Sequence, residues 1–236
     1  ADLDALARVW GDVPQGAERI VVPAGETLAR AIVLPVALSG VSIVDIDVTI
    51  EAGARFELHL LCADADYGRM SINVTLHEGA HFEMGGAILG NADQTLEIVT
   101  QVNHNHPNAT SNQVVRKVLA GHATGSFLGK VAVARHAQGT DAAQSVKAML
   151  LDRTATANAK PELEIYADDV KCAHGATVGE LDKGALFYMA ARGIPPQLAR
   201  KLMLQAFIAD AFVSLGDDAT REAIEARALA ALEALA

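Results

Sequence analysis

The chain has 236 residues, of which 51% are hydrophobic and only 4% are aromatic. That length is enough to bury a sizeable core, and the composition predicts a core built from Ala, Val, Leu and Ile. The formal net charge of −10 repels polyanions, which argues against nucleic acid or an anionic membrane surface as a partner. The sequence has no run of about 18 apolar residues, so it predicts no membrane span.

The N-terminal stretch ADLDALARVW places apolar side chains at helical spacing and carries no basic run. It predicts a short amphipathic helix and linker within residues 1–17, and not a secretory signal. The two cysteines, Cys62 and Cys172, do not form a disulfide framework, although one disulfide between them stays open. These features favour the reducing cytoplasm as the location.

From residue 18 to residue 181 the sequence predicts short strands. Apolar and polar residues alternate in VDIDVTI (44–50), RFELHL (55–60) and ELEIYA (162–167). This region is therefore expected to be a β-structure throughout.

A repeat runs through the predicted strands. EAGARFEL and HEGAHFEM are near copies that contain Gly53 and Gly79, and similar turns occur at Gly25, Gly125 and Gly175. Each glycine is expected at a corner that needs positive φ. A unit of about 25 residues matches two or three short strands, so stacked units predict a β-helix. A β-sandwich or barrel is the alternative.

From residue 182 to residue 236 the pattern predicts helices. KGALFYMAARG predicts a helix ended by Gly193, and the next helix begins at Pro195 or Pro196 and ends at Gly216. Two apolar stripes run along this second helix: Leu198, Leu202, Ala206, Ala209 and Val213 on one side, and Met203, Phe207 and Ala211 on the other. Such a helix is buried on two sides, or buries one side in a partner.

A third helix is predicted near the C-terminal end, with Asp217 or Asp218 as its cap. One face of this helix carries Ile224, Ala228, Leu232 and Leu235.

Four histidines raise the question of a metal site. His104 and His106 form an HxH pair of the kind that cupins use, but no Glu follows at the expected distance. His77 and His81 lie in the repeated turn, and Arg55 replaces His81 in the other copy. We therefore interpret His81 as a solvated corner residue and favour a structural role for the HxH pair.

Acidic residues could instead point to acid–base catalysis. Glu162 and Glu164 alternate with apolar residues, which predicts one solvent face of a strand. Asp168 and Asp169 are adjacent and are interpreted as a turn. A β-helix enzyme acting on carbohydrate would need these residues or Asp152 to converge on a groove.

Cys172 and His174 have i, i+2 spacing, which places both side chains on one face of a strand. A thiolate and an imidazole about 6 to 7 Å apart along the strand could each reach one soft metal or cluster. Two ligands are too few for a cluster, so such a site needs a second chain. The residues alone favour a buried cysteine beside a solvated histidine.

Three segments together resemble the SufB/SufD family of iron–sulfur cluster assembly proteins, and the SufD branch in particular. They are KPELEIYADDVKCAHGATVGELD (160–182), HNHPNATSNQVVRKVLAG (104–121) and LFYMAARGIP (186–195). The resemblance covers roughly residues 95–215. Members carry a long N-terminal region, whereas here the first predicted strand follows directly after the short segment 1–17.

The resemblance implies a right-handed parallel β-helix with a C-terminal helical part. It implies a non-enzymatic scaffold that pairs with SufB through the β-helix and binds the ATPase SufC, which hydrolyses ATP, through the C-terminal helices. The iron–sulfur cluster or iron is expected to be transient and shared with SufB. The shared pairing surface also makes a homodimer plausible for the isolated chain.

Carried over by position, the family's functional Cys and His fall on Cys172 and His174. His174 is expected to be a cluster or iron ligand, and Cys172 a neighbour buried until ATP-driven motion exposes it. The ATPase-contacting segment falls on residues 186–212, and the residues expected at that contact are Leu186, Phe187, Tyr188, Arg192, Gly193 and Ile194. The implied division is residues 1–17, a β-helix core at 18–181 and a helical domain at 182–236. The alternatives are a carbohydrate-acting enzyme and a metal-storing cupin-like module.

Overall fold

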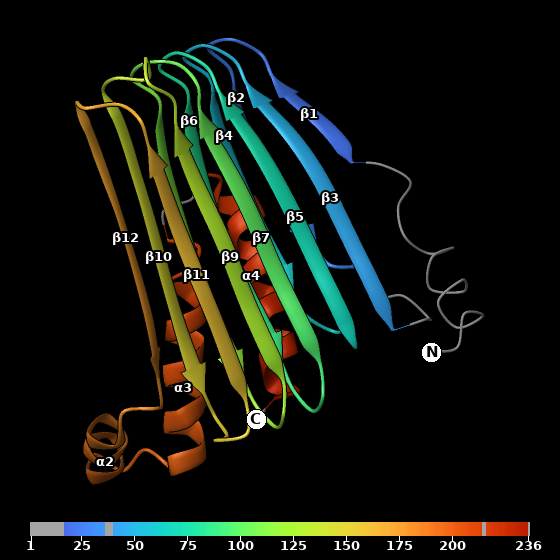
Figure 1. Ribbon diagram of the computed structural model, residues 1–236. Coiled ribbons are helices and arrows are strands. Elements are labelled where there is room, and N and C mark those ends of the chain that lie inside the picture. Colours follow the sequence, from blue (N-terminus) through green and yellow to red (C-terminus); the bar gives the residue numbers. More distant parts are fainter. Residues whose placement is uncertain (1–16, 36–39, 214–215, 236) are drawn as a thin grey trace.

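Figure 1 shows the computed structural model, which describes residues 17–35, 40–213 and 216–235. Twelve strands come first: β1 (Glu18–Val22), β2 (Thr27–Val33), β3 (Val41–Ile50), β4 (Arg55–Cys62), β5 (Tyr67–Leu76), β6 (His81–Gly90), β7 (Thr95–His104), β8 (Thr110–Leu119), β9 (Thr124–Val133), β10 (Thr140–Leu150), β11 (Thr156–Ile165) and β12 (Val170–Gly179). Helices α2 (Lys183–Ala191), α3 (Pro196–Ala209) and α4 (Asp218–Glu233) follow. The helix expected within residues 1–17 lies outside the described residues.

The strands form two six-stranded sheets that the chain visits in turn. One sheet has the order β1-β3-β5-β7-β9-β11 and the other the order β12-β10-β8-β6-β4-β2, and the described strand pairings are parallel. Each coil therefore contributes one strand to each sheet, as Figure 1 shows. This arrangement confirms the parallel β-helix with a C-terminal helical part, and the sandwich or barrel alternative is wrong.

The repeating unit differs from the expected one. It holds two long strands, such as β5 and β6, where the sequence pattern allowed two or three short ones. Val41 is stacked on Tyr67 in an early coil, whereas Thr124 is stacked on Thr156 in a late one, at a wider separation in sequence. From β3 to β11 the period therefore lengthens, because the turns grow while each strand of this sheet keeps 10 residues.

Only three of the five glycines that the repeat predicts at corners lie at corners. Gly25, Gly53 and Gly79 have φ of 73°, 65° and 64°, a region that L-residues with a side chain rarely adopt. Gly125 and Gly175 do not lie at corners, so their prediction is wrong: they are strand residues of β9 and β12. In β9 the missing side chain leaves room for Leu119, whose Cδ2 would lie 2.7 Å from an added Cβ at Gly125.

Two apolar layers hold the fold together. The first fills the space between the sheets with inward side chains such as Phe56, Leu58, Phe82 and Val131. The second joins the outer face of the β2–β12 sheet to α3 and α4, and none of the described helices lies on the outer face of the β1–β11 sheet (Figure 1). None of the three described helices has the length and hydropathy needed to cross a membrane.

The packed face of α4 agrees with the sequence, and that of α3 does not. Ile224, Ala228 and Leu232 are buried, and Leu235 packs beside them. In and after α3 the buried residues are Ala199, Leu204, Ile208, Ala211 and Phe212. The predicted stripe leaves Leu198, Leu202 and Val213 exposed. The helix ends at Ala209, earlier than expected, and the exposed stripe matches the alternative in which one side of the helix is left to a partner.

The helices dock on the sheet through a close backbone approach and an ion pair. An added Cβ at Gly85 would lie 2.1 Å from the Ala211 carbonyl oxygen, so only glycine permits this contact. Beside it, the Arg116 guanidinium is 4% exposed and contacts Asp210 at 2.6 Å. Its Nη1 also donates to the Ser145 carbonyl at 3.0 Å. The helical part is thereby fixed to the middle coils of the β-helix.

Candidate functional site

The last coil forms an open end of the β-helix. Among the described strands, β12 pairs only with β10, and β11 pairs only with β9. Side chains at this end are exposed although they are apolar, notably Tyr166 at 60% and Val178 at 53%. An edge strand offers unpaired backbone donors and acceptors to another chain. This end is therefore suited to protein pairing.

Cys172 and His174 both lie on β12, on the face that continues the interior of the β-helix. Cys172 is half-buried and packs against the inner apolar core, while His174 is exposed. His174 is paired in register with Gln144 of β10. The structure thus brings the two residues together at the open end, where no further described coil covers them.

The Cys172 thiol is not activated in the isolated chain. Partial burial raises its pKa, and the Asp141 carboxylate raises it further, while a backbone hydrogen bond from Ala142 acts in the opposite direction. Lys171 lies on the other face of β12. The thiol therefore stays protonated at neutral pH. Both cysteines are free, so no disulfide joins Cys172 to the buried Cys62.

Polar side chains run inward beneath His174, and the sequence pattern did not reveal them. Gln113 and Gln144 are buried on the inner faces of β8 and β10, and they are paired in register. The Thr100 hydroxyl of the opposite sheet donates to Gln113 Oε1 at 2.7 Å. Gln113, Gln144 and His174 each lie one coil from the next, a relation that becomes visible only once the strand register is known.

A lysine also points into this part of the interior. Lys117 Nζ donates to the carbonyl oxygens of Gly125 at 3.2 Å and Asn158 at 2.8 Å. Burial lowers its pKa to about 8, because the charged amine has lost its water. The interior near the open end is therefore more polar than that of the first coils.

The histidines outside β12 do not form a metal centre. His104 is fully buried, shares a 2.9 Å hydrogen bond with Ser111 Oγ, and has its pKa lowered to about 4 by burial. His77 and His106 stack with ring centroids 4.8 Å apart, and His136 follows His106 at 6.3 Å. Within residues 17–35, 40–213 and 216–235, no group of three or more His, Cys, Asp or Glu is arranged to hold a metal.

His81 corrects an expectation. It is not a solvated corner residue but the first residue of β6, and its Nδ1 lies 2.6 Å from Thr110 Oγ1. Its Nε2 lies 3.2 Å from Glu83, so the ring is fixed on both sides.

The acidic residues do not converge on a groove. Asp152 follows β10 and accepts from the Gly121 amide, whereas Asp168 and Asp169 form a bend after β11. The whole length of β11 separates these two corners, which is roughly 33 Å. Glu162 and Glu164 lie on the outer face of β11, paired with Lys160 and Lys130. These positions do not support a pair of catalytic carboxylates.

The helical part presents exposed apolar side chains. Phe187 is 76% exposed and Tyr188 58%, and Leu198 and Leu202 of α3 are also exposed. The Arg192 guanidinium lies 5.0 Å from the Tyr188 ring centroid, and Gly193 ends α2 with φ of 84°. Leu186 and Ile194 are half-buried. Exposed apolar surfaces of this kind are typical of protein contacts.

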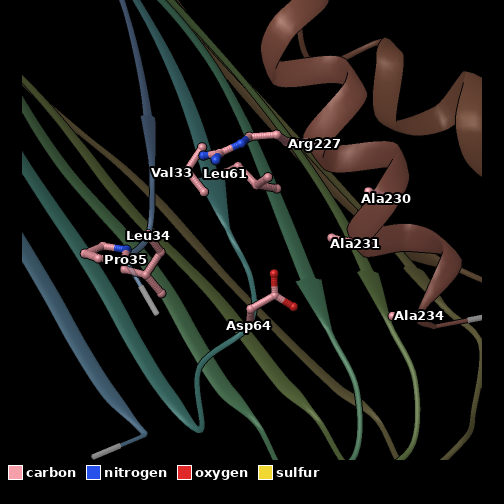
Figure 2. Close-up of a pocket in the computed structure, with 9 residues that line it drawn as sticks. All are labelled: Val33, Leu34, Pro35, Leu61, Asp64, Arg227, Ala230, Ala231 and Ala234. Atoms are coloured by element: carbon pink, nitrogen blue, oxygen red, sulfur yellow. The ribbon is translucent and has the colours of Figure 1, made fainter. Parts of the chain in front are cut away.

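A cavity of about 560 Å³ lies near β2, at the opposite edge of the sheet from β12 and His174. It is formed by the end of β2, β4 and α4, and Figure 2 shows the charged side chains of Asp64 and Arg227 among the apolar residues that line it. It holds neither cysteine and none of the histidines, so we do not assign it to the same site as β12.

Residues 29–207 match the family model described as "SUF system FeS cluster assembly, SufBD core domain". The chain is 37% identical to protein ABCI7, chloroplastic, of Arabidopsis thaliana over 165 residues, which is 66% of the chain and 34% of that protein. It is 38% identical to the iron–sulfur cluster assembly protein SufD of Escherichia coli over 128 residues, 54% of the chain and 30% of that protein.

A SufBD family protein of Synechocystis is 42% identical over 103 residues, 44% of the chain and 23% of that protein. The chain thus matches about a third or less of the length of these curated relatives.

Proposed function

The chain belongs to the SufB/SufD family of iron–sulfur cluster assembly proteins, in its SufD branch, and from that premise we propose that it acts as a scaffold subunit of a cluster assembly complex. In this role it performs no catalysis of its own. It holds and orients a transient iron or cluster, while an ATPase partner of the SufC type hydrolyses ATP.

The proposed pairing surface for a SufB-like subunit is the open end of the β-helix. The exposed edges of β11 and β12 support it, because a partner's strands can continue both sheets. Tyr166 and Val178 would become buried in such a pairing. The same surface can join two copies of the chain, so we propose a homodimer for the isolated chain.

The observation that carries the proposed site is the position of His174. Its imidazole lies exposed on the inner face of the edge strand, where a second subunit would meet it. Imidazole and thiol are suitable donors for iron and for iron–sulfur clusters. His174 is the proposed ligand, and the partner supplies the remaining ligands.

Cys172 is proposed as a second donor that acts only when the interface moves. It packs against the inner core, and its raised pKa disfavours the thiolate that binds metal. Exposure to water and proximity to a bound cation would both lower that pKa. The cluster would then be shared between subunits and lost when they separate.

The proposed contact for the ATPase is the exposed surface of α2 and the start of α3. Phe187, Tyr188, Leu198 and Leu202 support it, since each would lose water against a partner. We propose the division near residue 182, between the last strand and α2, although α3 and α4 pack firmly on the sheet.

The test is reconstitution of the chain with a SufB-like subunit and a SufC-type ATPase, with iron and cluster content as the readout. We expect His174→Ala to abolish cluster formation and to leave assembly of the three subunits intact. The matched control is Lys171→Ala, on the opposite face of the same strand, which should form clusters normally. Normal cluster formation by His174→Ala would remove the proposed ligand role.

A further inference from the structure

The residue directly beneath His174 in the next coil is a buried glutamine. Gln144 of β10 and His174 of β12 are in-register neighbours, so their Cβ atoms lie about 4.8 Å apart and point to the same face. That face is the inner one, because Cys172 on it packs against the core. The amide of Gln144 is thus the polar group nearest to the base of the imidazole in the stacking direction.

This amide is buried and unpaired. Gln144 is 3% exposed, and neither its Nε2 nor its Oε1 has a hydrogen-bond partner among the described residues. A buried amide without partners is costly, so an unpaired one in a native interior calls for a functional explanation. Gly129 closes the opposite side, where an added Cβ would lie 2.8 Å from Gln144 Nε2. The Nε2 group thus lies against the Gly129 backbone of the opposite sheet, and the amide has to turn along the column of stacked strands to find a partner.

Gln113, in the neighbouring coil, offers a hydrogen-bond acceptor to the Gln144 amide. Thr100 Oγ1 donates to Gln113 Oε1 at 2.7 Å, and Gln113 is the in-register neighbour of Gln144 on the other side. A carbonyl oxygen has a second lone pair, so Gln113 Oε1 is able to accept from Gln144 Nε2 as well. In-register amides of this kind form ladders along stacked strands. A turn of the Gln144 amide that directs its Nε2 to Gln113 would direct its Oε1 to His174.

We propose that Gln144 is the positioning residue for His174: its Oε1 accepts the N–H of one ring nitrogen and leaves the other nitrogen free, with its lone pair facing out of the open end. Ligand histidines usually have such a partner, which fixes the tautomer and the ring orientation. This inference rests on the proposed function for the identity of the ligand. Both partners of the proposed hydrogen bond belong to this chain, so it is testable without a second subunit.

The first test is the tautomer of His174 in the isolated chain, measured by long-range ¹⁵N–¹H NMR on a ¹⁵N-histidine-labelled sample. Loss of the signal in His174→Gln assigns it. We expect one tautomer in the wild-type chain and a mixture of the two in Gln144→Met, which keeps the length of the side chain but accepts no hydrogen bond. A wild-type mixture, or an unchanged single tautomer in Gln144→Met, would overturn the proposal.

Two further variants keep the test decisive. Lys147→Met introduces the same residue on the outer face of the same strand, and it should retain the single tautomer. Gln144→Glu keeps an acceptor at the same reach, and it should also retain one tautomer. If Gln144→Glu gives a mixture, the proposal fails even where Gln144→Met does not fold.

The second readout is cluster formation in the reconstituted complex. We expect Gln144→Met to lower it by about ten- to a hundredfold, the usual effect of removing the partner of a ligand histidine. Normal cluster formation by His174→Ala, together with a tautomer that depends on Gln144, would refute the ligand role and keep the hydrogen bond. If His174→Ala abolishes cluster formation but the tautomer of His174 does not depend on Gln144, the ligand role stands and the proposed hydrogen bond is refuted.

Discussion

The inner face of the β2–β12 sheet changes character halfway along the β-helix. In-register residues of successive strands lie at one level of the sheet. At one such level, Leu58 and Met84 are followed in the later coils by Gln113, Gln144 and His174. At the neighbouring level Phe56 and Phe82 are followed by Ser111, Ala142 and Cys172. We call the inner residues of β4 and β6 the apolar half, and those of β8, β10 and β12 the polar half.

The same backbone thus serves two purposes. In the apolar half the inward side chains are sealed and contribute mainly to stability. In the polar half buried amides and an amine replace them, although each such group lowers stability unless it is hydrogen-bonded. Retaining polar groups next to an open edge is expected where an interior must also orient a ligand. The comparison therefore predicts that substitutions cost much stability in the apolar half, and cost little or gain stability in the polar half.

The largest effect should come from Phe82→Ala in the apolar half. Phe82 is fully buried and stacks on Phe56 with ring centroids 6.1 Å apart, so truncation leaves a cavity. We expect a loss of about 3–5 kcal/mol in the free energy of unfolding, measured by urea denaturation.

The matched control for Phe82→Ala is Cys172→Ala, at the same level of the sheet in the last coil. Cys172 is only half-buried, and we expect its truncation to lower the free energy of unfolding by less than about 1 kcal/mol. Equal losses for the two variants would mean that the last coil is as tightly packed as the coil of β6, and the distinction between the halves would fail.

Low pH should reduce the free energy of unfolding because His104 is buried in its neutral form. Its ring faces Ser111 of β8, the first strand of the polar half. Burial lowers the pKa of His104 from 6.5 to about 4, so the unfolded chain takes up a proton that the folded chain does not. The contribution is fully present above pH 6.5 and is lost as pH falls from 6.5 toward 4. At pH 4 the loss in the free energy of unfolding should be about 3 kcal/mol.

His104→Gln isolates this effect, because the amide can still bond Ser111 and does not titrate. The measurement is the difference in unfolding free energy between this variant and the wild type, taken at pH 7 and at pH 4. Titration of other groups, such as His59, whose pKa is also lowered by burial, cancels in that difference. A difference that stays the same at both pH values would contradict the assignment.

The sequence predicts the fold where local pattern and backbone geometry agree. The near copies around Gly53 and Gly79 lie at real corners with positive φ, and the face of α4 follows from its helical spacing. Gly125 and Gly175 carry the same local signature but lie within strands. A glycine next to small residues fits both a corner and a tightly packed strand, and only the stacked neighbours decide between them.

The site is predictable only in part for a similar reason. The shared face of Cys172 and His174 follows from their spacing, because alternation along a strand is a local property. The relation of Gln144 to His174 is not local: it depends on the length of the coil between them, and the strand register shows that coils differ in length. No fixed period could have brought these two residues together without that register.

Gln144→Met in the polar half should raise the free energy of unfolding, whereas Phe82→Ala and acid lower it, and the change should be smaller. The variant replaces a buried amide that lacks partners within the described chain by an apolar side chain of similar length. The proposed hydrogen bond to the exposed imidazole is readily replaced by water, so we expect a gain of about 1 kcal/mol in the free energy of unfolding. Stability that rises while cluster formation falls would show a residue retained for function.

Leu58→Met is the control for Gln144→Met, since it places the same residue at the same level in the apolar half. It should be neutral or lower the free energy of unfolding by less than about 1.5 kcal/mol. If Gln144→Met is destabilising by several kcal/mol instead, the amide has strong partners in the fold, and the polar half is not the weaker one.

The smallest effect concerns the reactivity of Cys172 at the open end. Its pKa is raised by partial burial and by the Asp141 carboxylate on the neighbouring strand, so less thiolate is present at any given pH than in the unfolded chain. We expect iodoacetamide at pH 8 to modify Cys172 more slowly in the folded chain than in urea. Cys62 should stay unmodified in the fold, because burial raises its pKa to about 12.

Asp141→Asn removes the charge and keeps the size of the side chain, and it should speed the alkylation of Cys172 roughly two- to threefold, since the carboxylate acts through partly solvated surroundings. The control is Asp152→Asn, at the far corner that follows β10, which should leave the rate unchanged. If neither variant alters the rate, burial alone holds this thiol protonated. A partner would then activate Cys172 by exposing it to water, and not by displacing the Asp141 carboxylate.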